Sequence, residues 1–101
     1  MVVVRFKVRS QPDQSEQVLA ALRDVVAPSR ALLGVISFDI GRDVTDPNSF
    51  IATEVYEDQA AMDRQEAMPE VAKALGVLGS SLVAEPEATI FTVSSSKPWG
   101  G

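Results

Sequence analysis

Four stretches of the chain alternate between apolar and polar residues, with the period of two that is typical of a strand with one buried face. They are residues 2–9, 35–40, 50–56 and 88–93. In the second stretch the alternation places Ile36 and Phe38 on the apolar face and Val35 on the other. In the third, apolar residues occupy both faces, so we expect both faces to be covered.

Between the first two predicted strands, apolar residues recur with the period of a helix. The stripe consists of Val18, Leu22, Val25, Ser29 and Leu32. Asp13, with Glu16 three residues later, has the pattern of a capping box and predicts the start of this helix. Pro28 removes one backbone hydrogen bond and should kink the helix, and Gly34 is expected to end it.

The next segments predict a hairpin and a second, interrupted helix. Residues 45–48, which include Asp46, Pro47 and Asn48, have the composition of a turn, which would join the two middle strands. Asp58 is expected to cap a helix that Pro69 breaks and then restarts. The restarted segment has an apolar stripe of Val71, Ala74, Leu75 and Leu78.

The order β-α-β-β-α-β predicts an α+β domain with the ferredoxin-like fold, in which helices cover one face of a four-stranded antiparallel sheet. We expect this domain to span residues 1–93 and the polar residues 94–101 to form a flexible C-terminal tail. The pattern alone leaves open which sheet face meets the helices. The second face would be lined by Val3, Val35, Ile51, Thr53, Val55, Thr89, Phe91 and Val93. A patch of this kind is a liability on a monomer, so we predict a homodimer through this sheet face.

The composition excludes several kinds of chemistry. The 101 residues include no Cys and no His, which excludes thiolate metal sites, histidine-ligated zinc or haem, and a Ser-His-Asp triad. There is also no acidic cluster with the spacing of a calcium loop, so we expect no metal site. The formal net charge of −5 argues against binding to nucleic acid. No apolar run approaches the roughly 20 residues of a membrane span, and the absence of Cys favours the cytoplasm.

Three segments carry a resemblance to a known family. Residues 28–40 resemble the helix-to-strand junction of the antibiotic biosynthesis monooxygenase (ABM) domain family, where a Ser-Arg, a Pro-Gly and a small-Leu-Ser-Tyr-Glu-Leu strand are usual. Residues 46–50 and 54–58 are similar to that family's Asp-Pro turn and its Glu-x-Trp-x-Asp strand end. The resemblance covers nearly the whole chain. It implies a dimeric α/β barrel, and it implies either a cofactor-independent quinol or polyketide monooxygenase or a haem-degrading enzyme.

The sequence departs from the family pattern where many members carry a pair of histidines. Aligned through Pro69, these positions are Gln65 and Glu70, and the family's strand-end Trp is Tyr56. The haem-degrading branch needs an axial His, so the resemblance points to the branch that works without metal or flavin.

A cofactor-free oxygenase needs a water-free pocket and a polar group that stabilises a substrate anion. Tyr56 is the first catalytic candidate, because its phenol can donate to a substrate oxygen; the alternative is a half-buried Tyr with its hydroxyl in water. Glu54, two residues earlier on the same strand face, is the second, as a base with a raised pKa. The alternative for Glu54 is a structural ion pair with Arg5 or Arg30.

Substrate binding is assigned to further side chains. Gln65 can hydrogen-bond a substrate oxygen but cannot titrate, and the alternative is an exposed helix Gln. Arg5 can hold an anionic ligand or a carboxylate of a second subunit. The apolar wall of the pocket is expected to come from Phe6, Phe38, Phe50, Met62 and Met68. The alternative is that these side chains simply fill the core.

The leading interpretation is a cofactor-independent monooxygenase that acts on a small aromatic quinol or polyketide-like molecule. Tyr56 and Gln65 would orient the substrate, and Glu54 or the substrate's own acidity would provide the anion. The second interpretation is a non-catalytic ligand-binding or dimerisation domain on the same scaffold, because the family's histidines are absent. A third is a structural dimer without a ligand.

Overall fold

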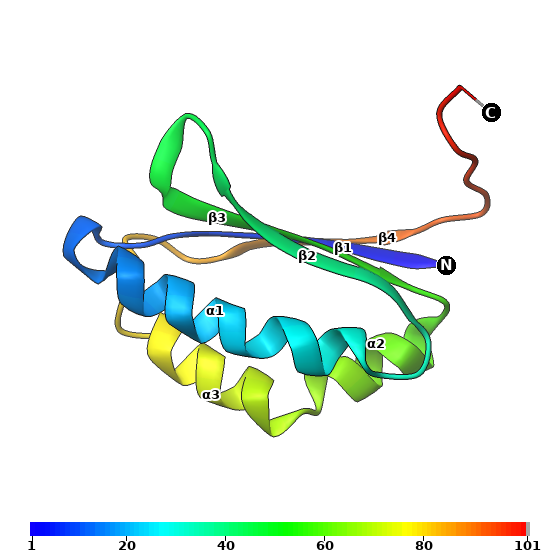
Figure 1. Ribbon diagram of the computed structural model, residues 1–101, viewed down its shortest axis with the longest axis horizontal. Helices are drawn as coiled ribbons and strands as arrows, with labels where there is room; N and C mark the ends of the chain where they lie inside the picture. The colour runs from blue at the N-terminus through cyan, green and yellow to red at the C-terminus, as the bar shows by residue number, and fades with distance from the viewer. Residues whose placement is uncertain (101) are drawn as a thin grey trace.

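The alternating segments form one antiparallel sheet in the computed structural model, which describes residues 1–100 (Figure 1). Its strands are β1 (Val2–Arg9), β2 (Val35–Asp43), β3 (Asp46–Tyr56) and β4 (Glu87–Thr92). They lie in the order β2-β3-β1-β4, so the first and third strands in sequence form the centre. The predicted α+β, ferredoxin-like arrangement is confirmed, with the helices on a single face of the sheet (Figure 1).

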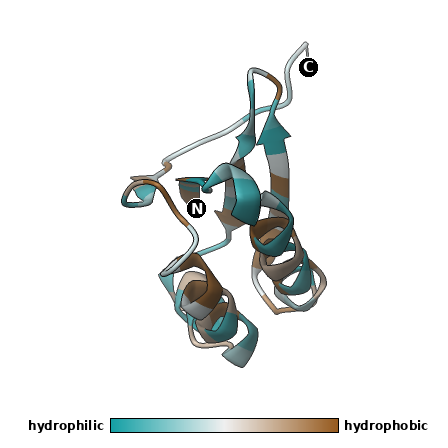
Figure 2. Ribbon diagram, turned by 90° about the vertical axis from the view of Figure 1, so that its left-hand side faces the viewer, coloured by the Kyte–Doolittle hydropathy of each residue, from teal (hydrophilic) through white to brown (hydrophobic). Residues whose placement is uncertain are grey.

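The helix layer consists of α1 (Ser15–Arg30), α2 (Gln59–Glu66) and α3 (Pro69–Leu78). Figure 2 shows two helices side by side on the same side of the sheet, each with hydrophobic and hydrophilic residues. The predicted interruption at Pro69 separates α2 from α3. Asp58 caps α2 as predicted, because its side chain accepts a hydrogen bond of 2.9 Å from the backbone N–H of Ala61.

The predicted start of the first helix is wrong. Residues Pro12–Gln14 form a short 3-10 turn, and α1 begins only at Ser15 without a side-chain cap. Glu16 does not complete a capping box; it accepts a hydrogen bond of 2.9 Å from Arg42 on β2. The ion pair between Glu16 and Arg42 on β2 thus takes the place of the predicted capping interaction at the start of α1. At the other end, α1 continues past Pro28 to Arg30.

The hairpin between β2 and β3 is also shorter than predicted. Only Val44 and Thr45 lie between the two strands, and residues 46–48 belong to β3. The turn is closed by Asp43, whose Oδ1 accepts hydrogen bonds from the backbone N–H and the hydroxyl of Thr45 at 2.9 and 2.7 Å. These bonds hold the pKa of Asp43 below its usual value. Pro47 therefore lies inside an irregular strand start and not in the turn.

A β-bulge corrects the expected faces of β2. Val35 pairs with Tyr56 and Ser37 pairs with Val55, so Ile36 is the extra residue between them. Ile36 is exposed, whereas Val35 packs against the core beside the helices. The predictions that Ile36 faces the core and that Val35 lines the second sheet face are therefore wrong.

The core lies between the sheet and the helices. From the strands it takes Val2, Val4, Val8, Phe38, Phe50, Ala52 and Tyr56, and from the helices Val18, Leu22, Val25, Ala61, Met62, Ala74 and Leu78. The core residues of β1 and β3 occupy alternate positions, as the pleat of a sheet requires, whereas β4 contributes none. Burial at these positions is the main stabilising contribution to the fold.

The outward face of the sheet carries rows of paired side chains across three strands. In one row, Val3 on β1 lies between Val55 on β3 and Phe91 on β4. In the next, Arg5 lies between Thr53 and Thr89. Phe91 is 47% exposed. The apolar character expected for this face is therefore concentrated in the first row.

Residues 94–100 follow β4 without forming a helix or strand, and Figure 1 shows this segment leading away from the sheet. Trp99 within it is fully exposed. The flexibility of the tail stays a prediction, and its last residue, Gly101, lies outside the described residues. No helix in residues 1–100 is both long and apolar enough to cross a membrane.

Candidate functional site

An apolar cavity of about 460 Å³ lies between the sheet and the helix layer, a size within the usual range of small-molecule sites. Its walls are formed by Val4, Phe6, Leu22, Val25, Ile40, Ala52, Glu54, Gln65, Glu66, Val71, Ala74, Leu75, Leu78, Ala88 and Ile90. The exposed side chains of Leu75, Ile90 and Glu66 place its opening between α3 and the edge strand β4. Only three of the lining side chains are polar: Glu54, Gln65 and Glu66.

Glu54 reaches the cavity from β3 and is held there by Tyr56. The two residues are two positions apart on one strand and therefore share a face. The Tyr56 hydroxyl donates a hydrogen bond of 2.6 Å to Glu54 Oε1. Tyr56 is 0% exposed and packs in a core cluster with Val2, Val4 and Met62. Tyr56 does not itself line the cavity, so its hydroxyl acts there through Glu54.

The surroundings of this pair raise the pKa of both groups. Burial raises the pKa of Glu54, the hydrogen bond from Tyr56 lowers it, and the nearby charge of Glu66 raises it further, with a net rise. Burial also raises the pKa of Tyr56, and its bond to the Glu54 carboxylate adds to the rise. The Glu54 carboxylate therefore accepts a proton more readily than an ordinary solvated Glu does.

Both structural alternatives for this pair are wrong. Tyr56 is fully buried, and its hydroxyl donates to Glu54. Glu54 pairs with neither arginine: Arg5 is exposed in the row of Thr53, on the outward sheet face. Arg30 donates to the Phe38 carbonyl at 2.9 Å and to Asp39 at 3.0 Å. Arg5 accordingly lies outside the cavity.

Gln65 reaches the cavity from α2 and is buried, with 4% of its surface exposed. Its Nε2 donates to the hydroxyl of Ser29, a buried residue of α1, at 3.2 Å. Its Oε1 accepts no hydrogen bond from the described residues. The alternative of an exposed helix Gln is wrong, and the free acceptor is available to a ligand.

The expected aromatic and methionine wall is only partly present. Phe6 lines the cavity. Phe38, Phe50 and Met62 are buried in the surrounding core clusters, and Met68 is partly buried at the start of α3. Most of the wall is instead made by aliphatic side chains, because the alternating strand positions that face the helices are chiefly Val, Ile and Ala.

Glu66 is a lining residue that sequence reasoning missed. It is the last residue of α2 and follows Gln65 directly. Consecutive helix residues normally point about 100° apart, so the periodic pattern assigned only one of them to the buried side. Pro69 was the sequence signal that could have found Glu66, because it predicts that α2 ends nearby. At the end of a helix beside a cavity, two consecutive residues can both reach the cavity opening.

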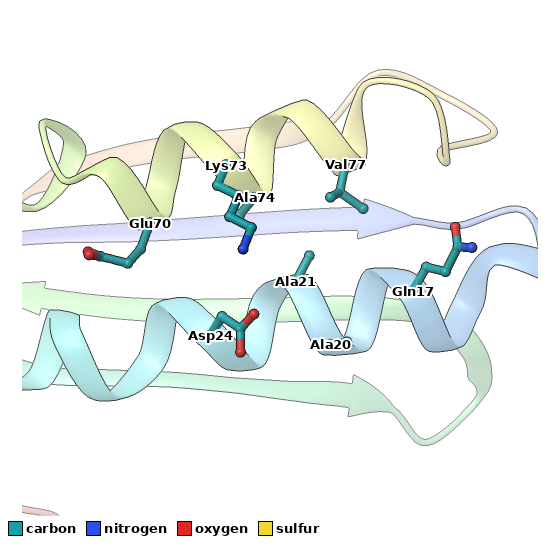
Figure 3. A pocket seen from close by; sticks show the side chains of 8 residues that line it. All are labelled: Gln17, Ala20, Ala21, Asp24, Glu70, Lys73, Ala74 and Val77. Atoms are coloured by element: carbon teal, nitrogen blue, oxygen red, sulfur yellow. The ribbon is translucent and has the colours of Figure 1, made fainter.

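A second hollow, of about 600 Å³, lies on the outer side of the helix layer between α1 and α3 (Figure 3). Asp24 from α1 and Lys73 from α3 project into it from opposite sides. Its charged side chains Asp24 and Lys73 are exposed, and small side chains such as Ala20 and Ala21 also line it. It contains no buried polar group, so the inner cavity is the better candidate site.

The same scaffold and sequence pattern occur in a known family. Residues 1–86 match the antibiotic biosynthesis monooxygenase family. The chain belongs to this family. The histidine positions implied by the earlier resemblance now have places in the structure: Gln65 lines the inner cavity, whereas Glu70 lines the outer hollow.

Individual relatives of this ABM-family chain are distant. The chain is 36% identical over 62 residues to protein sll1783 of Synechocystis sp., and 31% identical over 62 residues to YcnE of Bacillus subtilis, which is named a candidate monooxygenase. Each match covers 61% of the chain. The matched stretches span 42% and 65% of these relatives' own lengths.

Solved ABM-type structures have the same fold. One is a candidate antibiotic biosynthesis monooxygenase from Deinococcus radiodurans, with a TM-score of 0.90, 19% identity and full coverage of both chains. Another is Rv0793 from Mycobacterium tuberculosis, with a TM-score of 0.89, 21% identity, and coverage of 96% of this chain and 98% of that one. At this level of identity the likeness concerns the fold alone.

Proposed function

We propose that this ABM-family protein is a cofactor-independent monooxygenase that oxidises a small aromatic quinol or polyketide-like phenol. The observation that carries the proposal is a carboxylate, Glu54, that lines an otherwise apolar cavity and whose pKa is raised by burial. A base of this kind can take a proton from a phenol inside a water-poor site.

The proposed reaction balances without an external reductant. A phenol with an unsubstituted ring carbon reacts with O₂ to give a quinone and water. One oxygen atom forms a new bond to the ring carbon, and the other leaves as water. The substrate supplies all four electrons, so the protein needs only to bind, orient and deprotonate it.

The side chains then have separate roles. Glu54 accepts the hydroxyl proton of the substrate, which makes the ring electron-rich enough to react with O₂. Tyr56 is a positioning residue, since its hydroxyl is 2.6 Å from Glu54 Oε1 and does not line the cavity. Gln65 offers Oε1 to a second donor on the substrate while Ser29 holds its amide in place. The aliphatic wall excludes water.

A non-catalytic ligand-binding domain is the second candidate, and the observation that favours it is Gln65. A Gln occupies the cavity position at which the family resemblance implies a His, and an amide cannot transfer a proton. In this case the cavity binds the same aromatic molecules without turnover.

We also propose that two copies pair through the outward sheet face and that the protein acts in the cytoplasm. The row of Phe91, Val3 and Val55 supports the pairing, because it leaves contiguous apolar surface on the face away from the helices. The helix-side cavity of each copy would remain accessible at its opening beside β4.

Oxygen uptake by the purified protein tests the proposed activity. A panel of quinols and polyketide phenols is incubated with the protein under ¹⁸O₂, and the products are analysed by mass spectrometry. The proposal predicts uptake with one ¹⁸O atom in the quinone, and at least about a hundredfold loss in Glu54→Gln. Absence of uptake above a buffer control across the panel, with binding retained, would support the ligand-binding domain instead.

A further inference from the structure

Every polar side chain on the wall of the inner cavity presents a hydrogen-bond acceptor. Glu54 and Glu66 are carboxylates. Gln65 Nε2 uses one of its two N–H groups on Ser29, and its Oε1 accepts no hydrogen bond from the described residues. Acceptors therefore outnumber donors on this wall, so a ligand with its own donors is favoured, because an acceptor opposite an acceptor costs the free energy of an unpaired buried group.

No Lys or Arg is found among the residues that line this cavity in the described part of the chain. The arginines of neighbouring segments are engaged elsewhere: Arg64 donates to the Leu33 carbonyl at 2.9 Å, and Arg30 pairs with Asp39. The charge of Glu66 already acts unfavourably on ionised Glu54. A ligand that arrives with a negative charge would add a third repelling group in a poorly solvated space.

We propose that the cavity selects aromatic ligands that are neutral or cationic and carry hydrogen-bond donors, and that it rejects aromatic carboxylates and phosphates. This inference rests on the proposed function in taking the cavity as the substrate site. It narrows the substrate class to phenols that enter uncharged. The anion needed for oxidation then forms inside, when the hydroxyl proton moves to Glu54, so that negative charge is transferred within the cavity and not carried into it.

Three naphthalene probes of similar shape test the selectivity by isothermal titration calorimetry at pH 7. They are 2-naphthol, which is a neutral donor, 2-naphthylmethylammonium, which is a cationic donor, and 2-naphthoate, which is an anionic acceptor. The proposal predicts that the first two bind at least about tenfold more tightly than the third. Equal or tighter binding of 2-naphthoate, or no saturable binding of any probe, would overturn it.

Reversing the charge of Glu66, at the cavity opening, tests whether this residue causes the charge selectivity. Glu66→Lys should bring 2-naphthoate affinity up by about tenfold or more and weaken the ammonium probe. The variant is expected to fold, because Glu66 is exposed at the C-terminal end of α2, where a cation suits the helix dipole. Glu66→Gln gives a milder second variant, with the same direction of change.

Asp24→Lys is the matched control, since it makes the same charge change in the outer hollow (Figure 3). It should leave the ranking of the probes unchanged, and an equal effect of both reversals would overturn the inference. Oxygen uptake on the same samples keeps the two proposals separate. If the probes bind in the predicted order but no oxygen is consumed, only the proposed oxygenase activity is refuted. If aromatic carboxylates are oxidised as fast as neutral phenols, only the proposed charge selectivity is refuted.

Discussion

The hydroxyl of Tyr56 lies 2.6 Å from Oε1 of Glu54, so a fully buried phenol fixes the carboxylate that faces the cavity. The distance is typical of a hydrogen bond to a charged oxygen, which is stronger than one between neutral groups. Because the two residues are neighbours on one face of β3, no loop movement is needed to form the pair. The carboxylate is therefore held in one orientation before a ligand arrives.

Removing this hydrogen bond should change the titration of Glu54. In Tyr56→Phe the bond that lowers the pKa of Glu54 is lost while burial and the Glu66 charge remain, so the pKa should rise further. The acid limb of kcat/KM against pH should move to higher pH. Carbon-13 NMR of the Glu54 carboxyl measures the same shift without requiring turnover, and an unchanged titration would contradict the assigned role of Tyr56.

Glu54 should also make stability depend on pH. Its pKa is higher in the folded chain than the unfolded value of about 4.3, so the folded state binds the extra proton between those two values. The contribution of Glu54 to stability therefore falls as pH rises through that interval, by about 1.4 kcal/mol for each pH unit it spans.

Glu54→Gln is the matched variant for this test, because it cannot titrate and still offers Tyr56 an acceptor. Urea unfolding of both proteins from about pH 4 to about pH 7 should show the wild type losing stability relative to the variant; a constant difference would refute this.

Gln65→His should test whether the cavity supports imidazole chemistry. The new ring lies where the amide now contacts Ser29 Oγ, so one ring nitrogen can keep that bond and the other can face the cavity. We expect oxygen uptake to increase by about tenfold or more, the lower range for an added general base. Ser29→Ala in the same background is the control, because it should reduce the gain by releasing the ring.

Gly34 should tolerate no side chain. Its φ is +87°, and an added Cβ would lie 2.7 Å from the Cβ of Ala61. Gly34→Ala should destabilise the fold by more than about 1 kcal/mol through both strain and overlap. Gly76→Ala is the matched control: it lies within α3 with open space around it, and should stabilise by about 0.5–1 kcal/mol. Chemical denaturation of the two variants measures both effects, and the same sign for both would contradict the argument.

The outward row should set the oligomeric state. Val55→Glu places a charge beside Val3 in the apolar row, which should shift the proposed dimer to monomer in sedimentation velocity at micromolar concentration. Leu33→Glu adds the same charge at a position that is 80% exposed in the loop before β2, and should leave the association unchanged. A wild-type chain that sediments as a monomer would refute the pairing.

The sequence predicted the elements of this fold well because its strands and helices differ clearly in period. It failed where one contact overrode the local pattern. Asp13 and Glu16 have capping-box spacing, yet Glu16 bonds to Arg42, which also lies 5.2 Å from the Phe50 ring centroid. That partner is 26 residues away, beyond the reach of any local rule. Likewise Ile36 alternates correctly with Phe38, but a bulge shifts it outward.

The candidate site was predictable in its central pair and not in its outline. Glu54 and Tyr56 share a face because they are two apart on a strand, so their proximity followed from the period alone. The cavity depends on how far the helices stand from the sheet, which the order of residues does not specify. Phe38 and Met62 therefore lie in the core, whereas Leu75 and Ile90 line the cavity.

From Phe50 to Tyr56, β3 uses alternate residues for two different purposes. Phe50, Ala52, Glu54 and Tyr56 face the helices, and Ile51, Thr53 and Val55 face outward. Point substitutions should thus alter the proposed chemistry and the proposed pairing independently, although the residues for both lie within seven consecutive codons. A deletion of a single codon there would move the residues on one side of the deletion to the opposite face, so this strand should diverge by replacement and resist changes in length.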